Sequence, residues 1–153
     1  MRLGLLTYNI AREWDLDTLL RKCDELGYQG VELRVDQGHA HGVEVTLGKD
    51  ERAAVRRKID ATSVVLCGLG SGCRYDSPDP AVVAREVEHT KELLQLCCDL
   101  GAPGLKVFGN NFHEDEGIER ARTIEQVAKA LAECARTAND LGVEVRFEMH
   151  GDF

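Results

Sequence analysis

Two pairs of ionisable side chains stand at spacings that could support chemistry. The segment "HAHGVE" carries His39 and His41, and "FEMHGDF" carries Glu148 and His150 with the same spacing. In an extended segment, residues i and i+2 lie on one side of the chain. The histidines could therefore bind a metal or a substrate, and His150 could contact a substrate or orient a site. The alternatives are solvated loop histidines and, for Glu148, an ion pair with a nearby cation.

Arg34 and Trp14 complete the candidate binding residues. Arg34 precedes the histidine pair, and its guanidinium could anchor a phosphate or carboxylate of a substrate, although a salt bridge is the alternative. Trp14 could form a pocket wall or simply pack in the interior. The stretch "GLGSGC" at 68–73 does not run directly into a helix, so the dinucleotide fingerprint is not met and a close-packed loop is expected. His89 has no evident partner.

A repeated pattern predicts the elements that position these residues. Helix-like runs end in Leu-Gly three times and are followed by an extended apolar run, as expected because glycine readily ends a helix. Apolar periodicity predicts helices at 16–26, 51–61, 81–100 and 124–141. It also predicts strands at 3–8, 30–35, 63–69, 104–109 and 143–149.

Strict alternation of strands and helices predicts an α/β fold with parallel strands. A five-stranded flavodoxin-like sheet suits the 153-residue length, whereas a complete (β/α)8 TIM barrel typically needs about 250 residues. Two strand segments, 30–36 and 143–150, alternate apolar residues with charged ones. A sheet covered by helices on both faces has no place for such a charged face. The pattern therefore favours a partial barrel with strands in the order 1-2-3-4-5.

Composition and charge argue against several classes of function. The formal net charge of −8 argues against binding nucleic acid through bulk charge. Six cysteines without zinc-finger spacing are interpreted as reduced thiols of a cytoplasmic protein. No apolar stretch approaches the roughly 20 residues of a membrane span, and no signal-peptide cleavage site is evident. These features indicate an ordinary globular protein.

Four segments together resemble the xylose isomerase-like TIM barrel family, the sugar phosphate isomerase/epimerase group related to the AP endonucleases. The segments are "GVELR", "HAHGVE", "SGCRYDSPDP" and "FEMHGDF". The resemblance implies that Glu148 is a divalent-metal ligand, with Mg²⁺ or Mn²⁺ expected and Zn²⁺ or Co²⁺ as alternatives. A carboxylate at the C-terminal end of a barrel strand would indeed face the active-site mouth. The implied substrate is a sugar, sugar phosphate or related polyol.

The resemblance covers only the first five strands of that fold. We therefore expect residues 1–153 to be the N-terminal part of a single TIM-barrel domain, inactive alone because later strands supply further ligands. Two exposed sheet edges predict self-association or pairing with the missing C-terminal strands. A non-catalytic, self-associating half-barrel is one alternative function. An AP-endonuclease-like repair enzyme is another, disfavoured by the negative charge.

Overall fold

Five parallel strands form a single sheet in the computed structural model, which describes all residues 1–153. The strand order is β1-β2-β3-β4-β5, with every neighbouring pair parallel. This order confirms the partial barrel and excludes a flavodoxin-like sheet, in which the first strand lies between the second and third. The strands are β1 (Gly4–Leu6), β2 (Gly30–Arg34), β3 (Val65–Gly70), β4 (Gly104–Phe108) and β5 (Glu144–Glu148).

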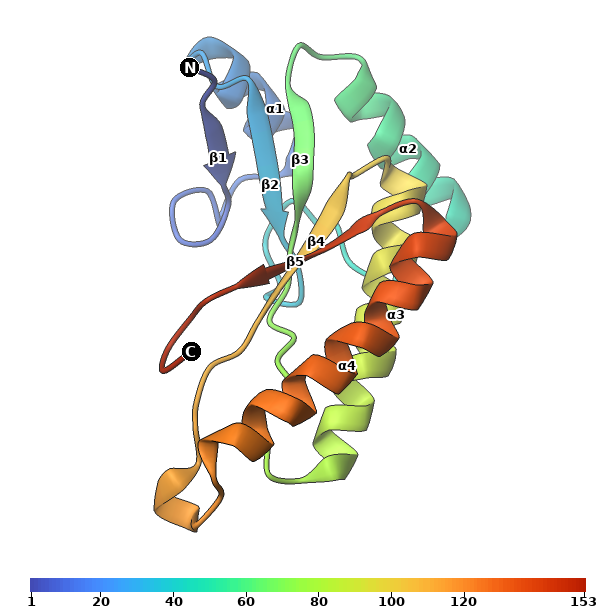
Figure 1. Ribbon diagram of the computed structural model, residues 1–153. Coiled ribbons are helices and arrows are strands. Elements are labelled where there is room, and N and C mark those ends of the chain that lie inside the picture. The colour runs from blue at the N-terminus through green and yellow to red at the C-terminus, as the bar shows by residue number, and fades with distance from the viewer.

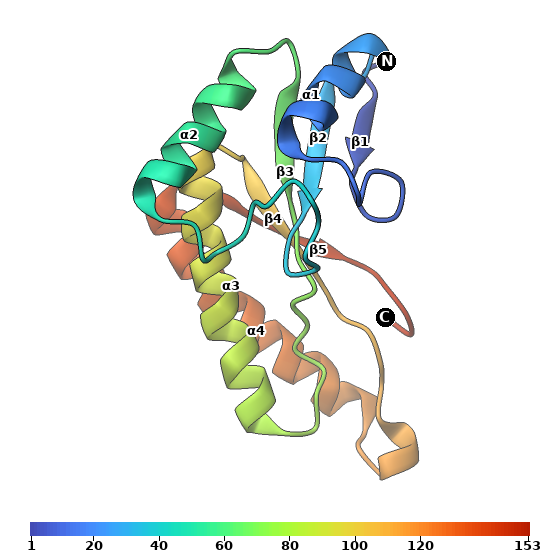
Figure 2. The ribbon, with the colours of Figure 1, turned by 180° about the vertical axis from the view of Figure 1, so that it is seen from behind.

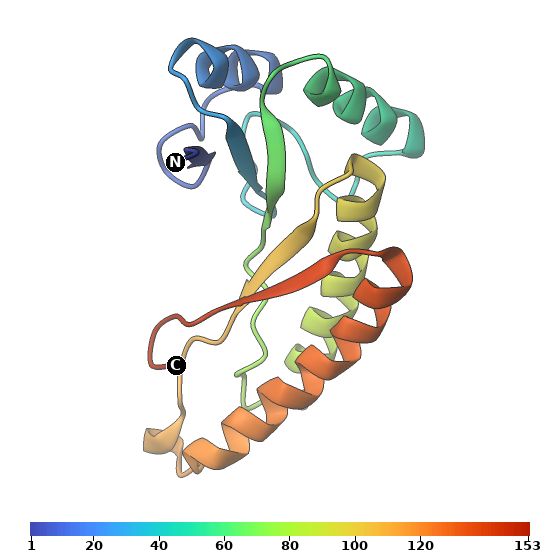
Figure 3. The ribbon, with the colours of Figure 1, turned by 45° about the horizontal axis from the view of Figure 1, so that its top comes forward.

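Four α-helices connect consecutive strands and lie on the outer side of the curved sheet. Figure 3 shows this arc, with the helices around the convex side and the opposite side open. The two longest helices, α3 and α4, run side by side and extend beyond the strands they connect (Figures 1 and 2). The helices are α1 (Leu16–Glu25), α2 (Lys49–Asp60), α3 (Pro80–Leu100) and α4 (Arg120–Leu141), with a short 3-10 turn η1 (Glu114–Glu116) before α4.

The start of α3 agrees with the sequence prediction. Asp79 is its N-cap and accepts a hydrogen bond from the backbone N–H of Ala81, and Pro80 occupies the first helical position. The cap satisfies an otherwise unpaired N–H, and proline has no N–H to leave unpaired at that position. α2 instead begins at Lys49 with Gly48 as its N-cap, which is earlier than the predicted start at residue 51.

The predicted start of α4 at residue 124 is wrong. The helix begins at Arg120, with Glu119 as its N-cap. Thr123 and Gln126 have the spacing of a capping box at the predicted start, but the side-chain amide of Gln126 donates instead to the backbone carbonyls of Tyr75 and Ser77 at 2.7 and 2.9 Å. No local sequence pattern predicts this long-range contact with the segment after β3.

The charged and apolar residues of the strands separate onto two faces, as predicted. Val31, Leu33 and Val35 of the β2 segment are fully buried against the helices. Lys106 and Arg146, on neighbouring strands, lie on the opposite, open face with the charged residues of β2. We call this the inner face; its charged members are Glu32, Arg34, Lys106, Arg146 and Glu148.

The cysteines and the helices also agree with the predictions from composition. All six cysteines are free thiols, and four of them are buried, in agreement with their interpretation as reduced thiols. None of the helices combines the length and apolar character that crossing a membrane requires.

Candidate functional site

Glu148, at the C-terminal end of β5, forms an ion pair with Lys106, in the middle of the neighbouring strand β4. The distance from Lys106 Nζ to Glu148 Oε2 is 2.8 Å, and β4 and β5 place Phe108 directly beside Glu148 in the register. The hydrogen bond from Lys106 lowers the pKa of Glu148, so that the carboxylate is ionised. The Lys106 ammonium also lies 4.7 Å from the centroid of the Phe108 ring. The ion pair considered as an alternative for Glu148 is therefore present.

His150 lies just beyond β5 on an exposed turn. Its Nδ1 is 2.9 Å from Asn110 Oδ1, to which the ring nitrogen donates. The ring also contacts Phe108, with 4.9 Å between ring centroids. His150 thus bridges the segments that follow β4 and β5, while its other nitrogen makes no hydrogen bond within the protein.

Arg34 is a buried cation without a salt bridge. Its exposed fraction is 8%, yet no carboxylate lies within salt-bridge distance. One Nη donates to the carbonyl of Ser71, the guanidinium carbon lies 5.9 Å from the centroid of the Tyr8 ring, and Nε has no hydrogen-bond partner. A buried cation without an anion is costly, so the surroundings of Arg34 favour the arrival of an anionic group.

The two loop histidines are buried, not solvated. His41 is fixed at both nitrogens: Nε2 donates to the Arg34 carbonyl and Nδ1 accepts from the Val43 N–H, each at 3.0 Å. Burial lowers the pKa of His41 to about 4, so the ring is neutral at pH 7. With both nitrogens occupied by the backbone, His41 holds the loop against β2 and has no lone pair for a metal.

His39 packs beside His41, with 5.5 Å between their ring centroids. It is 5% exposed, and its Nδ1 has no hydrogen-bond partner. Burial, followed by the charges of Arg12 and Arg34, lowers the pKa of His39. His39 is therefore a neutral ring whose nitrogens make no hydrogen bond within the protein. Trp14 is half-buried and packs against the apolar core, which is the simpler of its two expected roles.

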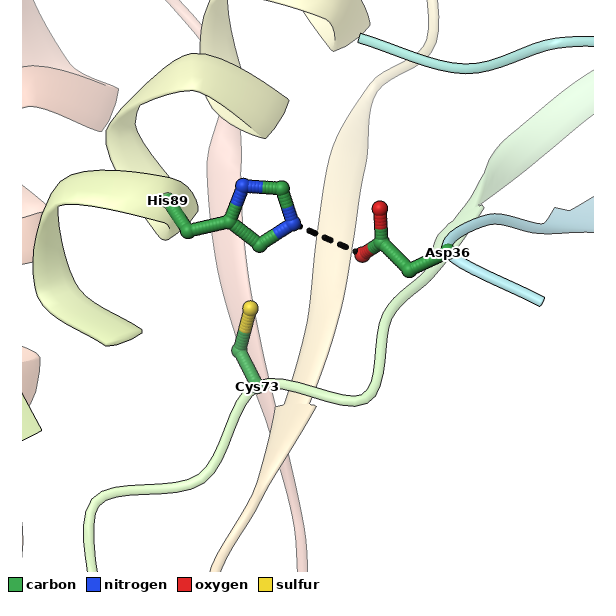
Figure 4. Close-up of side chains that lie close together, drawn as sticks. All are labelled: Asp36, Cys73 and His89. Carbon is green, nitrogen blue, oxygen red and sulfur yellow. Dashed lines mark ion pairs between the residues drawn. The ribbon is translucent and has the colours of Figure 1, made fainter. Parts of the chain in front are cut away.

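One cluster of candidate ligands has no counterpart in the sequence analysis. His89, on α3, lies 3.0 Å from Asp36 and close to the buried thiol of Cys73 (Figure 4). These residues are far apart in the sequence and form no recognisable motif. This cluster is also the one place where three His, Cys, Asp or Glu ligand atoms converge, and Glu148 belongs to no such group.

Solved structures of sugar epimerases share this fold. A D-psicose 3-epimerase crystallised with D-fructose has a TM-score of 0.73 at 20% identity, with 95% of this chain and 51% of that chain covered. The IOLI protein with a bound zinc atom has a TM-score of 0.77 at 15% identity, with coverages of 97% and 51%. A 3-keto-D-glucoside 4-epimerase, YcjR, from E. coli has a TM-score of 0.74 at 15% identity, with coverages of 96% and 55%.

The chain spans about half the length of these structures. It therefore corresponds to a partial barrel, as the five-stranded sheet with its open inner face also shows. No curated protein matches the sequence. A comparison with protein-family profiles matches residues 20–153 to one family. The chain belongs to the xylose isomerase-like TIM barrel family.

Proposed function

We propose that residues 1–153 form the N-terminal half of a divalent-metal-dependent isomerase or epimerase that acts on a sugar, sugar phosphate or related polyol. The observation that carries the proposal is the position of Glu148, an ionised carboxylate at the C-terminal end of β5 on the inner face of the partial barrel. TIM-barrel enzymes build their active sites at this end of the strands. The epimerase names of the structural neighbours support the same reaction class.

Glu148 fits a divalent cation as one oxygen ligand. Its side chain is 43% exposed on the open inner face, and the cation now beside it is the ammonium of Lys106. A hard cation such as Mg²⁺ or Mn²⁺ requires about six oxygen ligands, and Glu148 belongs to no group of three converging ligand atoms. Further ligands must come from outside these five strands, so the chain alone is expected to be inactive.

The bound metal would polarise a substrate carbonyl or hydroxyl oxygen. Lys106 would hold the Glu148 carboxylate in its ionised form until the cation binds. Arg34, buried and without an anion, is the candidate anchor for a phosphate or carboxylate of the substrate, and its planar fork suits both groups. His39, whose ring makes no hydrogen bond within the protein, and His150, which keeps one nitrogen without a protein partner, could contact substrate hydroxyls.

A second candidate function is a self-associating half-barrel without turnover. Apolar side chains are exposed on or beside the sheet edges: Leu6 at 41%, Tyr8 at 53%, Ile10 at 74% and Met149 at 70%. An exposed apolar surface and two unpaired strand edges favour the binding of further protein segments along these edges. Either further strands of one polypeptide or a second copy of the chain would cover this surface. Light scattering at micromolar concentration distinguishes a stable monomer from a dimer.

The test compares the 153-residue chain with a longer polypeptide that also contains the remaining strands of the barrel. The longer protein should bind Mn²⁺ tightly and interconvert a keto sugar or its phosphate, and Glu148→Gln should abolish both properties together. A neutral amide offers one good acceptor oxygen where a carboxylate offers two. The 153-residue chain should bind Mn²⁺ weakly at Glu148 and show no turnover.

Glu144→Gln provides a matched control at the opposite end of β5, where the carboxylate is exposed and pairs with Arg146. This variant should keep metal binding and turnover in the longer protein. If Glu148→Gln also keeps both, Glu148 is a wall residue paired with Lys106 and the metal assignment is wrong.

A further inference from the structure

Three potential metal ligands converge away from the inner face. Asp36 follows β2, Cys73 follows β3 and His89 lies on α3. Their ligand atoms all lie within 4.8 Å of one another, and Figure 4 shows the side chains approaching from three separate segments. We propose that Asp36, Cys73 and His89 bind a divalent cation of the Zn²⁺ type.

The donor set matches the ligand chemistry of zinc. Zinc binds thiolate, imidazole and carboxylate in tetrahedral sites, with metal–ligand bonds of about 2.0–2.3 Å that place neighbouring ligand atoms roughly 3.3–3.8 Å apart. The three ligand atoms are already within 4.8 Å of one another, and His89 Nε2 lies 3.0 Å from Asp36 Oδ2. Side-chain movements of about 1 Å would therefore complete three corners of the tetrahedron.

The fourth corner can be supplied by water. The side chains of Asp36 and His89 are 24% and 33% exposed, whereas Cys73 is 1% exposed. The cluster thus has a buried sulfur at its base and an opening toward solvent. A soft thiolate disfavours Mg²⁺ and Mn²⁺, so the site is distinguished by chemistry from an all-oxygen site at Glu148.

Residues around the cluster orient its members. His89 Nδ1 lies 3.1 Å from Glu92 Oε2, one turn along α3, which leaves Nε2 directed at Asp36 and the thiol. A ligating histidine typically donates its other N–H to a carboxylate, and loss of that contact weakens metal affinity about 10- to 100-fold. The backbone N–H of Asp36 donates to Glu44 Oε2 at 2.8 Å and fixes the segment that carries the carboxylate.

Protons occupy the cluster when no cation is bound. Burial favours the neutral form of His89, but hydrogen bonds to Glu92 and Asp36 raise its pKa overall. Burial also raises the pKa of the Cys73 thiol to about 11. A coordinating cation deprotonates such a thiol outright, so the Asp36–His89 ion pair and the thiol represent the cation-free form of the site.

The site does not depend on the proposed isomerase function. His89 belongs to α3, on the helix-covered side of the sheet, whereas Glu148 lies on the inner face. Zinc at the cluster and manganese at Glu148 can therefore be tested separately in the same chain.

The experiment titrates Co²⁺, a spectroscopic substitute for Zn²⁺, into the reduced 153-residue chain. We expect one saturable site with an intense near-ultraviolet thiolate-to-cobalt absorption band, which Zn²⁺ displaces. Cys73→Ser should abolish the band, and His89→Gln should weaken binding at least about tenfold. Glu92→Gln, an exposed change on α3, should weaken Zn²⁺ binding about tenfold while the band persists.

Cys98→Ser removes a partly exposed thiol elsewhere and should leave the band unchanged, as should Glu148→Gln. Circular dichroism reports whether each variant is folded, and His89→Gln keeps the test valid if Cys73→Ser unfolds. The proposal is overturned if the folded wild type shows no saturable band. The proposal is also overturned if Cys73→Ser keeps the absorption band, or if His89→Gln binds Co²⁺ with the wild-type affinity.

Discussion

The carboxylate of Glu148, at the C-terminal end of β5, forms an ion pair at 2.8 Å with the ammonium of Lys106, in the middle of β4. The two residues lie on adjacent parallel strands and point to the same inner face. Lys106 therefore neutralises the carboxylate where a divalent cation would bind. A metal at Glu148 must compete with this ammonium or displace it.

Lys106→Met should raise the pKa of Glu148 toward its ordinary value, because the hydrogen bond from Lys106 is the largest influence that lowers it. The titration of the Glu148 side-chain carbonyl carbon, followed by NMR, measures this directly. Lys129→Met removes a remote exposed partner of Glu125 and should leave the Glu148 titration unchanged. An unchanged Glu148 titration in Lys106→Met would show that the pair does not form in solution.

Arg34→Lys should impair use of an anionic substrate by the protein that carries the remaining strands. Lysine keeps the charge but loses the planar fork that suits phosphate and carboxylate. We expect a rise in KM of about tenfold for a sugar phosphate, with kcat little changed, because a hydrogen bond to a charged group contributes about 1.5–3 kcal/mol. The KM for the corresponding neutral sugar should stay the same. Equal effects on the two substrates would argue that Arg34 is structural.

Protonation of His41 should destabilise the fold in acid. Its pKa in the folded protein, about 4, lies below the ordinary value of 6.5. Between these values the unfolded chain binds the additional proton, so stability falls as the pH drops from 6.5 toward 4. The loss should approach about 3 kcal/mol at pH 4. Urea unfolding of wild type and His41→Asn across this range should show a shallower pH dependence for the variant.

His150→Asn is the control for the previous measurement, because His150 is exposed. It should retain the wild-type pH dependence of unfolding. If His41→Asn and the wild type lose stability in parallel, the acid sensitivity comes from other groups.

Gly104→Ala should destabilise the sheet. An added Cβ would lie 2.8 Å from the backbone oxygen of Glu144 and 3.0 Å from Arg146 Nε. The backbone of β5 cannot move aside without breaking its pairing with β4, so a loss of about 1–3 kcal/mol is expected. Gly48→Ala, where the added atom meets only a glutamate side chain at 3.4 Å, should change stability little. Thermal unfolding of both variants checks the contrast, and equal melting temperatures would contradict it.

The architecture could be predicted from local patterns along the chain. Leu-Gly helix ends and the switch between helical and alternating apolar patterns located the strands and helices to within a few residues. The alternation of Val31 and Leu33 with Glu32 and Arg34 predicted a sheet with one charged face, which the structure confirms. These features are local, because backbone conformation and the direction of a side chain follow from near neighbours.

The contacts between side chains could be learned from the folded structure alone. His41 has the spacing of a metal ligand, yet the backbone occupies both of its nitrogens. His89 had no evident partner, yet α3 places it beside Asp36 and Cys73, in the segments that follow β2 and β3. Such contacts depend on crossovers that bring residues distant in sequence together. Periodicity therefore predicted the faces on which residues lie, while packing selected their partners.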